Sequence, residues 1–468
     1  MKLKSFALTS LTFCFAAICG TPSVQAATLT TIVDGISNAR ANSFGPDGSL
    51  YVAEPGIGGN GNCQPSPSAI FQPLCAGNSG SLVKVSPDGT KTRLLTNFQS
   101  VAEQPSGNQG AGIQDLQFDS LGNAYLLTGF AGYPGNRDKE TLELGSKFPL
   151  PETQLKVFPP SAPDKVLNAP NLAQLYKVDL NTGSLNSIFD FGKYEITNNP
   201  DGQDVVTNPY DLTIGGDTAY VVDGGGNAAY RIKLDGSDSE AIAIPKKIVS
   251  ASVLPSAPPG QELPPDLVEL LPGLVEQLPG GNIALQSVPT GGAIGPDGAF
   301  YVGEYTGFPY PENESRIFRI GEDGNPEVFL DGFTHITDLT FDENGNLLVL
   351  QFSDESQLNG DITNLPGSLI QVAPDGTRTT LVAAGEGLDS ADGIDIGPDG
   401  KIYITNRGVG PENGQVVRVD GLVTQKVPEP TSLLGLLALA SVGATSAIAK
   451  RKRPNKLGEE LLPKAETV

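Results

Sequence analysis

One short unit recurs six times along the chain and limits what the chain can fold into. In each copy an apolar alternation runs into a tight turn and out again, as it does around Gly397-Pro398-Asp399-Gly400. This pattern predicts a β-hairpin. The copies span residues 41–54, 113–129, 209–223, 291–304, 336–351 and 391–406. Five of them carry a tyrosine just after the turn (Tyr51, Tyr125, Tyr220, Tyr301 and Tyr403), and the fifth copy has Leu348 there. Self-similarity at this spacing indicates an array of like units.

A second hairpin follows each of these units. Its first strand is expected at residues 81–85, 174–178, 229–232, 316–320, 368–372 and 415–419. A fourth strand follows in the first five units but not in the sixth, and residues 29–35 resemble the missing strand. The sequence therefore predicts an all-β fold over residues 27–426, a six-bladed β-propeller closed by an N-terminal strand, which leaves no long exposed edge. A linear β-solenoid, the alternative, would not need a split terminal unit.

The two ends carry targeting signals. Residues 1–26 combine Lys2 and Lys4, an apolar run and Val24-Gln25-Ala26, which predicts a secretory signal peptide. Near the other end, the uncharged apolar stretch 431–449 precedes the basic cluster Lys450, Arg451, Lys452 and Arg453. This order predicts a transmembrane helix with its basic end in the cytoplasm. We therefore expect an exported body, periplasmic, at the cell surface or extracellular, that is anchored to the membrane at least transiently.

Residues 427–453 resemble a known sorting signal. Pro428, Glu429 and Pro430, followed by an apolar helix and a basic cluster, are similar to the PEP-CTERM signal of Gram-negative bacteria. The resemblance implies processing by an exosortase-type enzyme and delivery to the cell surface or extracellular matrix. A plain C-terminal anchor is the alternative. The polar tail 454–468 departs from the family pattern.

The body is strongly acidic. The chain has 30 Lys and Arg against 53 Asp and Glu, and without its two ends the balance is 22 against 50. Nucleic acid is therefore not an expected partner, and the charge favours cations or serves solubility. Of the four cysteines, Cys63 and Cys75 lie in this body within one loop, and we expect them to form a disulfide.

Topology predicts that the short turns lie on one face and the long connections on the other. The long ones are residues 55–80, 130–172, 245–289, 305–315, 353–367 and 407–414. Function usually resides on such loops, so this face is expected to be the functional one. Within it, residues 264–272 and 274–279 are expected to form two short helical turns.

Polar side chains are expected to converge where strands meet this face. The first strands begin near Asn42, Asp115, Asp211, Asp338 and Asp392, and the second strands end at Glu54, Asp223, Glu304 and Asn406. Ca²⁺ prefers oxygen ligands of these types, and Glu54, Asp211, Asp392 and Asn406 are the candidate ligands. Alternatively, Asp115, Asp211 and Asp338 cap backbone groups.

The hairpin units also resemble propellers of the gluconolactonase and paraoxonase type. That resemblance implies calcium-dependent hydrolysis, with axial Asn-Asp or Asn-Gly pairs, and only Asn42 and Asp392 match that pattern. His335 is the only histidine, so a histidine dyad is impossible, and no G-x-S-x-G motif is present. No catalytic residue is assigned.

Over residues 29–423 the chain resembles the ScyD/ScyE family of cyanobacterial exported propellers, which are related to NHL-repeat proteins. The resemblance rests on the six units, the turn tyrosines, the cysteine-tied loop and the proline-rich inserts. It implies a link to production of the pigment scytonemin. The first functional hypothesis is binding of an unknown ligand or matrix component without catalysis, and the alternative is a calcium-dependent lactonase or esterase.

Overall fold

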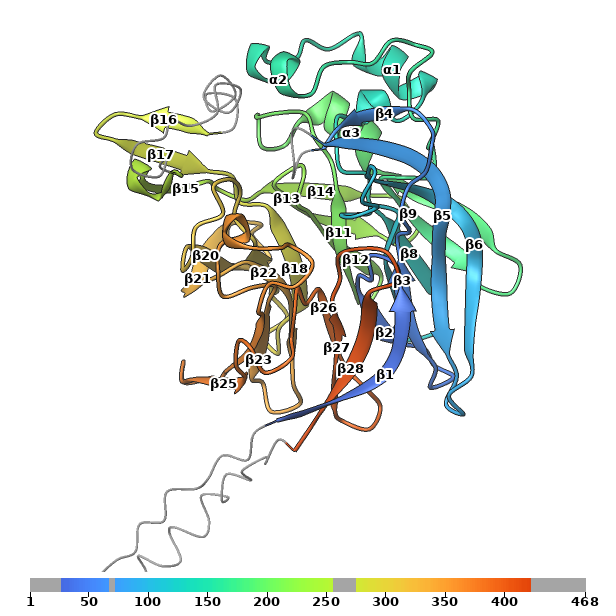
Figure 1. The fold of residues 1–468 in the computed structure, drawn as a ribbon, viewed down its shortest axis with the longest axis vertical. Coiled ribbons are helices and arrows are strands. Elements are labelled where there is room, and N and C mark those ends of the chain that lie inside the picture. The colour runs from blue at the N-terminus through green and yellow to red at the C-terminus, as the bar shows by residue number, and fades with distance from the viewer. Residues whose placement is uncertain (1–26, 67–71, 256–274, 422–468) are drawn as a thin grey trace, which may run out of the picture. The chain divides into compact units, whose positions relative to one another are not determined.

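The computed structural model describes residues 27–66, 72–255 and 275–421, which form mainly antiparallel β-sheet (Figure 1). The arrangement is consistent with a β-propeller. The predicted signal peptide, sorting signal and membrane helix lie outside these residues. Within them, no helix combines the length and apolar character needed to cross a membrane.

In the described residues, six sheets follow the predicted order of strands. The first strands are β2 (Asn42–Phe44), β7 (Ile113–Phe118), β11 (Pro209–Gly215), β18 (Pro289–Ile294), β22 (Ile336–Phe341) and β26 (Gly393–Ile396). The second are β3 (Leu50–Glu54), β8 (Ala124–Thr128), β12 (Thr218–Asp223), β19 (Phe300–Glu304), β23 (Leu347–Gln351) and β27 (Ile402–Asn406). The third are β5 (Pro73–Val85), β9 (Gln174–Asp179), β13 (Ala228–Lys233), β20 (Ser315–Ile320), β24 (Ser368–Val372) and β28 (Gly414–Asp420). The fourth are β6 (Lys91–Glu103), β10 (Ser184–Asp190), β14 (Ser239–Ala243), β21 (Pro326–Phe333), β25 (Arg378–Val382) and β1 (Thr28–Ile36).

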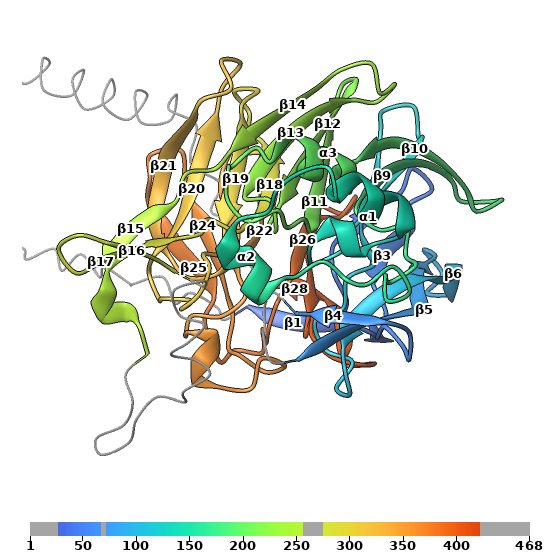
Figure 2. The same ribbon diagram turned by 90° about the horizontal axis from the view of Figure 1, so that it is seen from above.

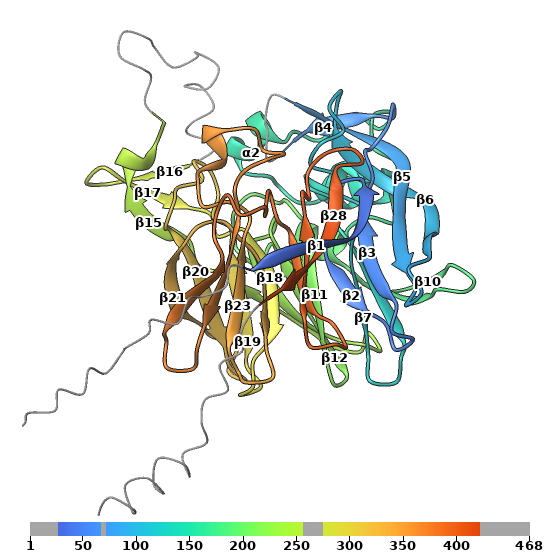
Figure 3. The same cartoon turned by 60° about the horizontal axis from the view of Figure 1, so that its bottom comes forward.

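The last sheet is completed by the N-terminal strand, as the sequence predicts. β1 pairs antiparallel with β28, with Thr28 opposite Asp420 and Ile36 opposite Gly414. Figure 3 shows β1 running alongside β28. The first strands of neighbouring sheets contact one another in chain order, and β26 contacts β2. The six first strands therefore form a closed series.

The turn tyrosines pack one sheet against the next. The Tyr51 ring lies 5.3 Å from that of Phe118 on β7, and Phe44 on β2 lies 4.8 Å from Tyr403 on β27. The glycine that opens the turn leaves room for the ring, because a Cβ at Gly397 would lie 2.5 Å from the Tyr403 side chain. The repeated Gly and Tyr thus serve packing between sheets.

The connections add smaller elements. β4 (Cys63–Pro65) joins β5, and the predicted disulfide Cys63–Cys75 is confirmed between them. A separate small sheet contains β15 (Lys247–Ser250), β16 (Glu276–Leu278) and β17 (Asn282–Leu285). Helical elements are η1 (Pro134–Asn136), α1 (Lys139–Gly145), α2 (Glu152–Val157), α3 (Phe191–Asn198), η2 (Ala251–Val253) and η3 (Gln357–Asn359).

One prediction within the connections is wrong. The expected helical turn at 274–279 contains strand β16, because its backbone pairs with β17 instead of closing on itself. The other predicted turn, at 264–272, lies outside the described residues.

Candidate functional site

A cavity of about 220 Å³ lies among the long connections. Its walls come mainly from the segments 109–111, 204–210, 286–290 and 305–310. The segments 286–290 and 305–310 fall largely within the predicted loops 245–289 and 305–315, whereas 109–111 and 204–210 lie in connections that the prediction did not include. Figure 2 shows the side of the molecule on which α1, α2 and α3 lie. Drug-sized ligands occupy sites of roughly 300–1,000 Å³, so this cavity suits a compact molecule.

A buried ion pair forms part of the lining. Arg40 Nη1 donates a hydrogen bond to Asp392 Oδ2 at 2.6 Å, and the Tyr210 hydroxyl lies 2.9 Å from both oxygens of that carboxylate. Arg40 also donates to the carbonyl oxygens of Gly408 and Gly110. Its Nε has no hydrogen-bond partner among the described residues, although Arg40 is only 7% exposed. One buried donor in the lining is therefore unsatisfied.

Burial and the ion pair shift the pKa values of this cluster in opposite directions. Burial alone would lower the pKa of Arg40, but Asp392, Tyr210 and Tyr305 together outweigh burial and the pKa is raised. Burial raises the pKa of Asp392, and Arg40 opposes that shift. Burial also raises the pKa of Tyr210 well above its usual value, so the phenol stays protonated at neutral pH. Arg40 and Asp392 thus cancel each other's charge.

Aromatic rings supply much of the remaining wall. The Tyr305 ring lies 6.3 Å from that of Tyr310 and 5.7 Å from that of Phe352, and Phe308 lies 6.0 Å from Tyr310. In the described part of the chain, six aromatic residues line the cavity: Phe158, Tyr210, Tyr305, Phe308, Tyr310 and Phe352.

His335 lies behind this wall and does not line the cavity. Its ring stacks on Tyr305 at 4.6 Å, and Nε2 donates to the backbone carbonyl of Tyr310 at 3.1 Å. Burial lowers the pKa of His335 to about 4, so it is neutral at neutral pH. The only histidine therefore supports the aromatic wall and is not placed to act as a general base on a molecule in the cavity.

Asp204 is a lining residue that the sequence analysis missed. It is half-buried and makes no hydrogen bond in the described part of the chain. Burial and the neighbouring Asp201 raise its pKa to about 6, while Lys246 opposes the shift. Asp204 lies in the connection between α3 and β11, whereas the predicted carboxylates lie at the ends of strands. The signal available in the sequence was its place in the polar connection 198–208, directly before β11.

Of the nine predicted site residues, only Asp392 lines this cavity. Glu54 and Glu304, at the ends of β3 and β19, are in ion pairs with Arg93 at 2.7 Å and Arg316 at 2.5 Å. Three others accept backbone hydrogen bonds from the next sheet: Asp115 from Leu212, Asp211 from Gly292 and Asp338 from Ile394. These three carboxylates therefore cap backbone groups, as the alternative prediction proposed, and the capped groups lie on the neighbouring sheet.

The last three predicted residues also have partners within the fold. Asp223 Oδ1 accepts from the backbone N–H groups of Asn208, Gly225 and Gly226. Asn406 accepts from the backbone of Asp389 at 2.7 Å, and Asn42 donates to Thr405 Oγ1 at 3.0 Å.

The predicted calcium ligands do not form a set. Glu54, Asp211, Asp392 and Asn406 have different hydrogen-bond partners, although the charge of Asp392 helps to raise the pKa of Asp211. No three His, Cys, Asp or Glu side chains in the described ranges are grouped so that they could hold a metal ion. The residues present therefore do not fit the calcium site that the hydrolase resemblance implies.

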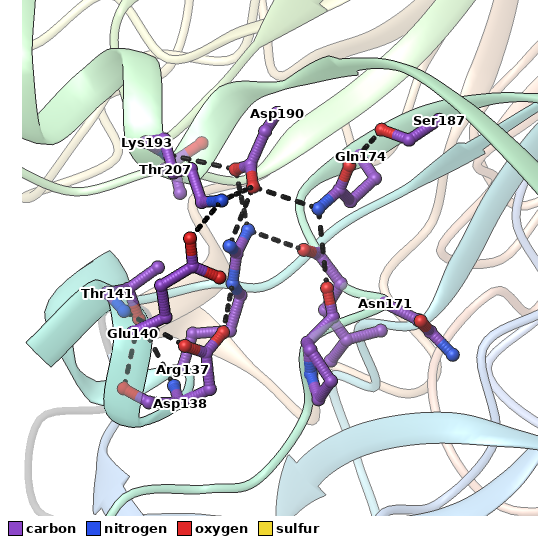
Figure 4. Close-up of polar contacts among 12 residues, drawn as sticks. Arg137, Asp138, Glu140, Thr141, Asn171, Gln174, Ser187, Asp190, Lys193 and Thr207 are labelled. Atoms are coloured by element: carbon purple, nitrogen blue, oxygen red, sulfur yellow. Dashed lines mark hydrogen bonds and ion pairs between the residues drawn. The ribbon is translucent and has the colours of Figure 1, made fainter.

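A buried arginine, Arg137, attaches the connection 130–172, which carries α1 and α2, to the sheet (Figure 4). The two Nη atoms of Arg137 donate to the two oxygens of Asp190 at 2.7 and 2.8 Å, and its Nε donates to Asp138. Asp138 in turn caps α1 through the backbone N–H of Thr141. The adjacent Asn136 binds the backbone of Pro159 and Ser161. The segment that carries Phe158 into the cavity is thereby attached to the sheet below.

No protein-family model matches the chain, and no curated protein matches it. Several solved structures are similar in fold. A streptogramin B lyase has a TM-score of 0.41 with 10% identity, over 84% of this chain and 97% of the other. A gluconolactonase from Xanthomonas campestris has a TM-score of 0.42 with 13% identity, over 84% and 90%. The PQQ-bound aldose sugar dehydrogenase of Streptomyces coelicolor has a TM-score of 0.45 with 12% identity, over 85% and 99%.

Proposed function

We propose that this chain is an exported six-bladed β-propeller that binds a compact small molecule in the loop-side cavity. The observation that carries the proposal is the cavity itself, with six aromatic residues and a buried Arg40–Asp392–Tyr210 cluster in its lining. Binding sites in proteins typically combine apolar walls with a few fixed polar groups. The blade count rests on the six sheets and on the pairing of β1 with β28.

The sorting part of the proposal rests on the sequence of the two ends. A signal peptide, Pro428-Glu429-Pro430, an apolar stretch and a basic cluster support export, exosortase processing and delivery to the cell surface or matrix. The resemblance to the ScyD/ScyE family suggests that the ligand belongs to the chemistry of scytonemin production or of the extracellular matrix.

Ligand-observed NMR with a library of compact aromatic fragments tests the binding function. We expect a subset of fragments to bind and to compete with one another for one site. Phe308→Ala should weaken these fragments together, because it removes one wall. The matched control is Phe329→Ala, which removes a ring that is 45% exposed on β21 and outside the cavity. Equal binding by both variants would contradict the proposal.

One observation favours the hydrolase alternative. Asp204 is an unbonded carboxyl in the cavity, with a pKa of about 6, and a general base works best when its pKa lies near the working pH. A screen of lactones and aryl esters with the wild type and Asp204→Asn tests this. Turnover that is lost in Asp204→Asn would establish the hydrolase, whereas the absence of turnover leaves the binding function.

A further inference from the structure

The charges in the cavity lining do not balance. Among the described residues, Arg40 is the only Lys or Arg in the lining, and Asp392 neutralises it at 2.6 Å. Asp204 makes no ion pair and no hydrogen bond with the residues that the structure describes. The lining therefore carries one uncompensated carboxyl.

Lys246, whose positive charge lowers the pKa of Asp204, already has other hydrogen-bond partners. Lys246 Nζ donates to Gln203 Oε1 at 2.5 Å and to Glu276 Oε2 at 2.9 Å. The other charged neighbour is Asp201, whose carboxylate accepts from the backbone of Gln203 and from Asn227 Nδ2. Neither group closes an ion pair with Asp204, so a ligand is the available partner for this carboxyl.

The rest of the lining suits a positive charge. Six aromatic residues surround the space, and the face of an aromatic ring attracts a cation within about 6 Å of its centroid. The chain also has a formal charge of −23, and a field of that sign draws cations toward the surface. An anion would meet neither a free cationic group nor a favourable field.

We propose that the cavity selects a compact organic cation, an aromatic or alkylated amine, whose ammonium group lies against Asp204 and the aromatic rings. This inference rests on the proposed binding function and specifies its ligand class.

Three probes of nearly equal size separate the possibilities by charge: benzylamine, benzyl alcohol and benzoate. Their affinities for the full-length protein are measured by titration calorimetry at pH 7.5. We expect benzylamine to bind about tenfold tighter than benzyl alcohol, since a desolvated cation–π contact and an ion pair together exceed about 1.4 kcal/mol. Benzoate should bind most weakly.

Two variants and one control test which side chains cause the preference for benzylamine. Asp204→Asn should abolish the advantage of benzylamine and leave benzyl alcohol unchanged. Asp331→Asn is the control, because it removes the same charge from an exposed site on β21 that makes no side-chain hydrogen bond. Phe308→Leu keeps an apolar wall but removes the ring, so it should weaken benzylamine more than benzyl alcohol.

The outcomes separate the proposed cation selectivity from the proposed binding function. Equal affinity for the three probes, or a preference for benzoate, overturns the cation selectivity and leaves a binding site. If none of the three probes binds and the fragment library also gives no competing set, both the selectivity and the binding function are overturned.

Discussion

The Asp211 carboxylate on β11 accepts a hydrogen bond from the backbone N–H of Gly292 on β18 at 2.7 Å. A side chain of one sheet thus supplies the acceptor for the main chain of the next. Asp115 and Asp338 make equivalent links at 3.0 and 2.8 Å. Residues that the sequence suggested for a metal therefore hold neighbouring sheets together.

Removing one of these links should destabilise the fold. In Asp338→Ala the buried N–H groups of Leu339 and Ile394 lose their acceptor, which costs about 1–3 kcal/mol for each buried group left unsatisfied. Asp338→Asn keeps one acceptor oxygen and should lose less. Urea unfolding measures the difference, with Asp331→Ala on exposed β21 as the control. Equal losses in Asp338→Ala and Asp331→Ala would refute the link.

The two Glu–Arg pairs should differ in importance because they differ in burial. The Glu304 and Arg316 side chains are 0% and 10% exposed, whereas Arg93, the partner of Glu54, is 41% exposed. Glu304→Ala leaves a buried guanidinium without its partner and should cost about 3–5 kcal/mol. Glu54→Ala should cost less, since water can solvate Arg93. Thermal and urea unfolding of both variants check the order, and the reverse order would rule out burial as the cause.

Asp395 should make stability depend on pH. Burial raises the pKa of this carboxyl on β26 to about 7, whereas an unfolded aspartate ionises near 3.9. The folded state therefore holds its proton more tightly, and the stability that Asp395 contributes falls as the pH rises from about 4 to about 7. The free energy of unfolding of the wild type minus that of Asp395→Asn should decline over this range and then level off. Parallel curves for the two proteins from pH 4 to 8 would show that the proton is not retained.

Arg137 should control attachment of the connection 130–172. Arg137→Lys cannot form the two-pronged contact with Asp190 and should destabilise the protein by about 2 kcal/mol, since hydrogen bonds to charged groups contribute about 1.5–3. The control is Lys147→Gln, which breaks the exposed Lys147–Glu143 pair of the same segment, where about 0–1 kcal/mol is expected. Limited proteolysis should cut the 138–170 segment faster in Arg137→Lys only. Similar cleavage of both variants would argue against this anchor.

Calcium tests the metal site that the hydrolase resemblance implies. A ligand specific to the folded state raises stability by RT ln(1 + [L]/Kd). Because the four candidate ligands have different hydrogen-bond partners in the protein, we expect equal unfolding temperatures in millimolar Ca²⁺, in Mg²⁺ and with a chelator. A higher unfolding temperature with Ca²⁺ alone would show a metal site and would support the calcium-dependent hydrolase.

The sequence predicted the sheets well because their signals are local. Alternation of apolar residues and the chemistry of Asp-Gly turns act over a few positions, and the missing last strand pointed to β1. The site depends on contacts between distant residues. Asp392 was expected to bind a metal, but it pairs with Arg40, 352 positions earlier. Arg137 meets Asp190 across 53 positions, and no local pattern indicates either partner.

The pairing of β1 with β28 also has a consequence for the order in which the chain acquires its structure. Thr30 on β1 contacts Asp420, 390 positions later. A ribosome adds about 5–20 residues per second, so the first strand to be made waits roughly 20–80 s for its neighbour. During that time its edge is unpaired and open to other strands. A chain that stops before β28 would have five of the six sheets complete, and β1 would have no strand to pair with. Truncation near the C-terminus should therefore expose an unpaired, aggregation-prone strand edge at the opposite end of the sequence.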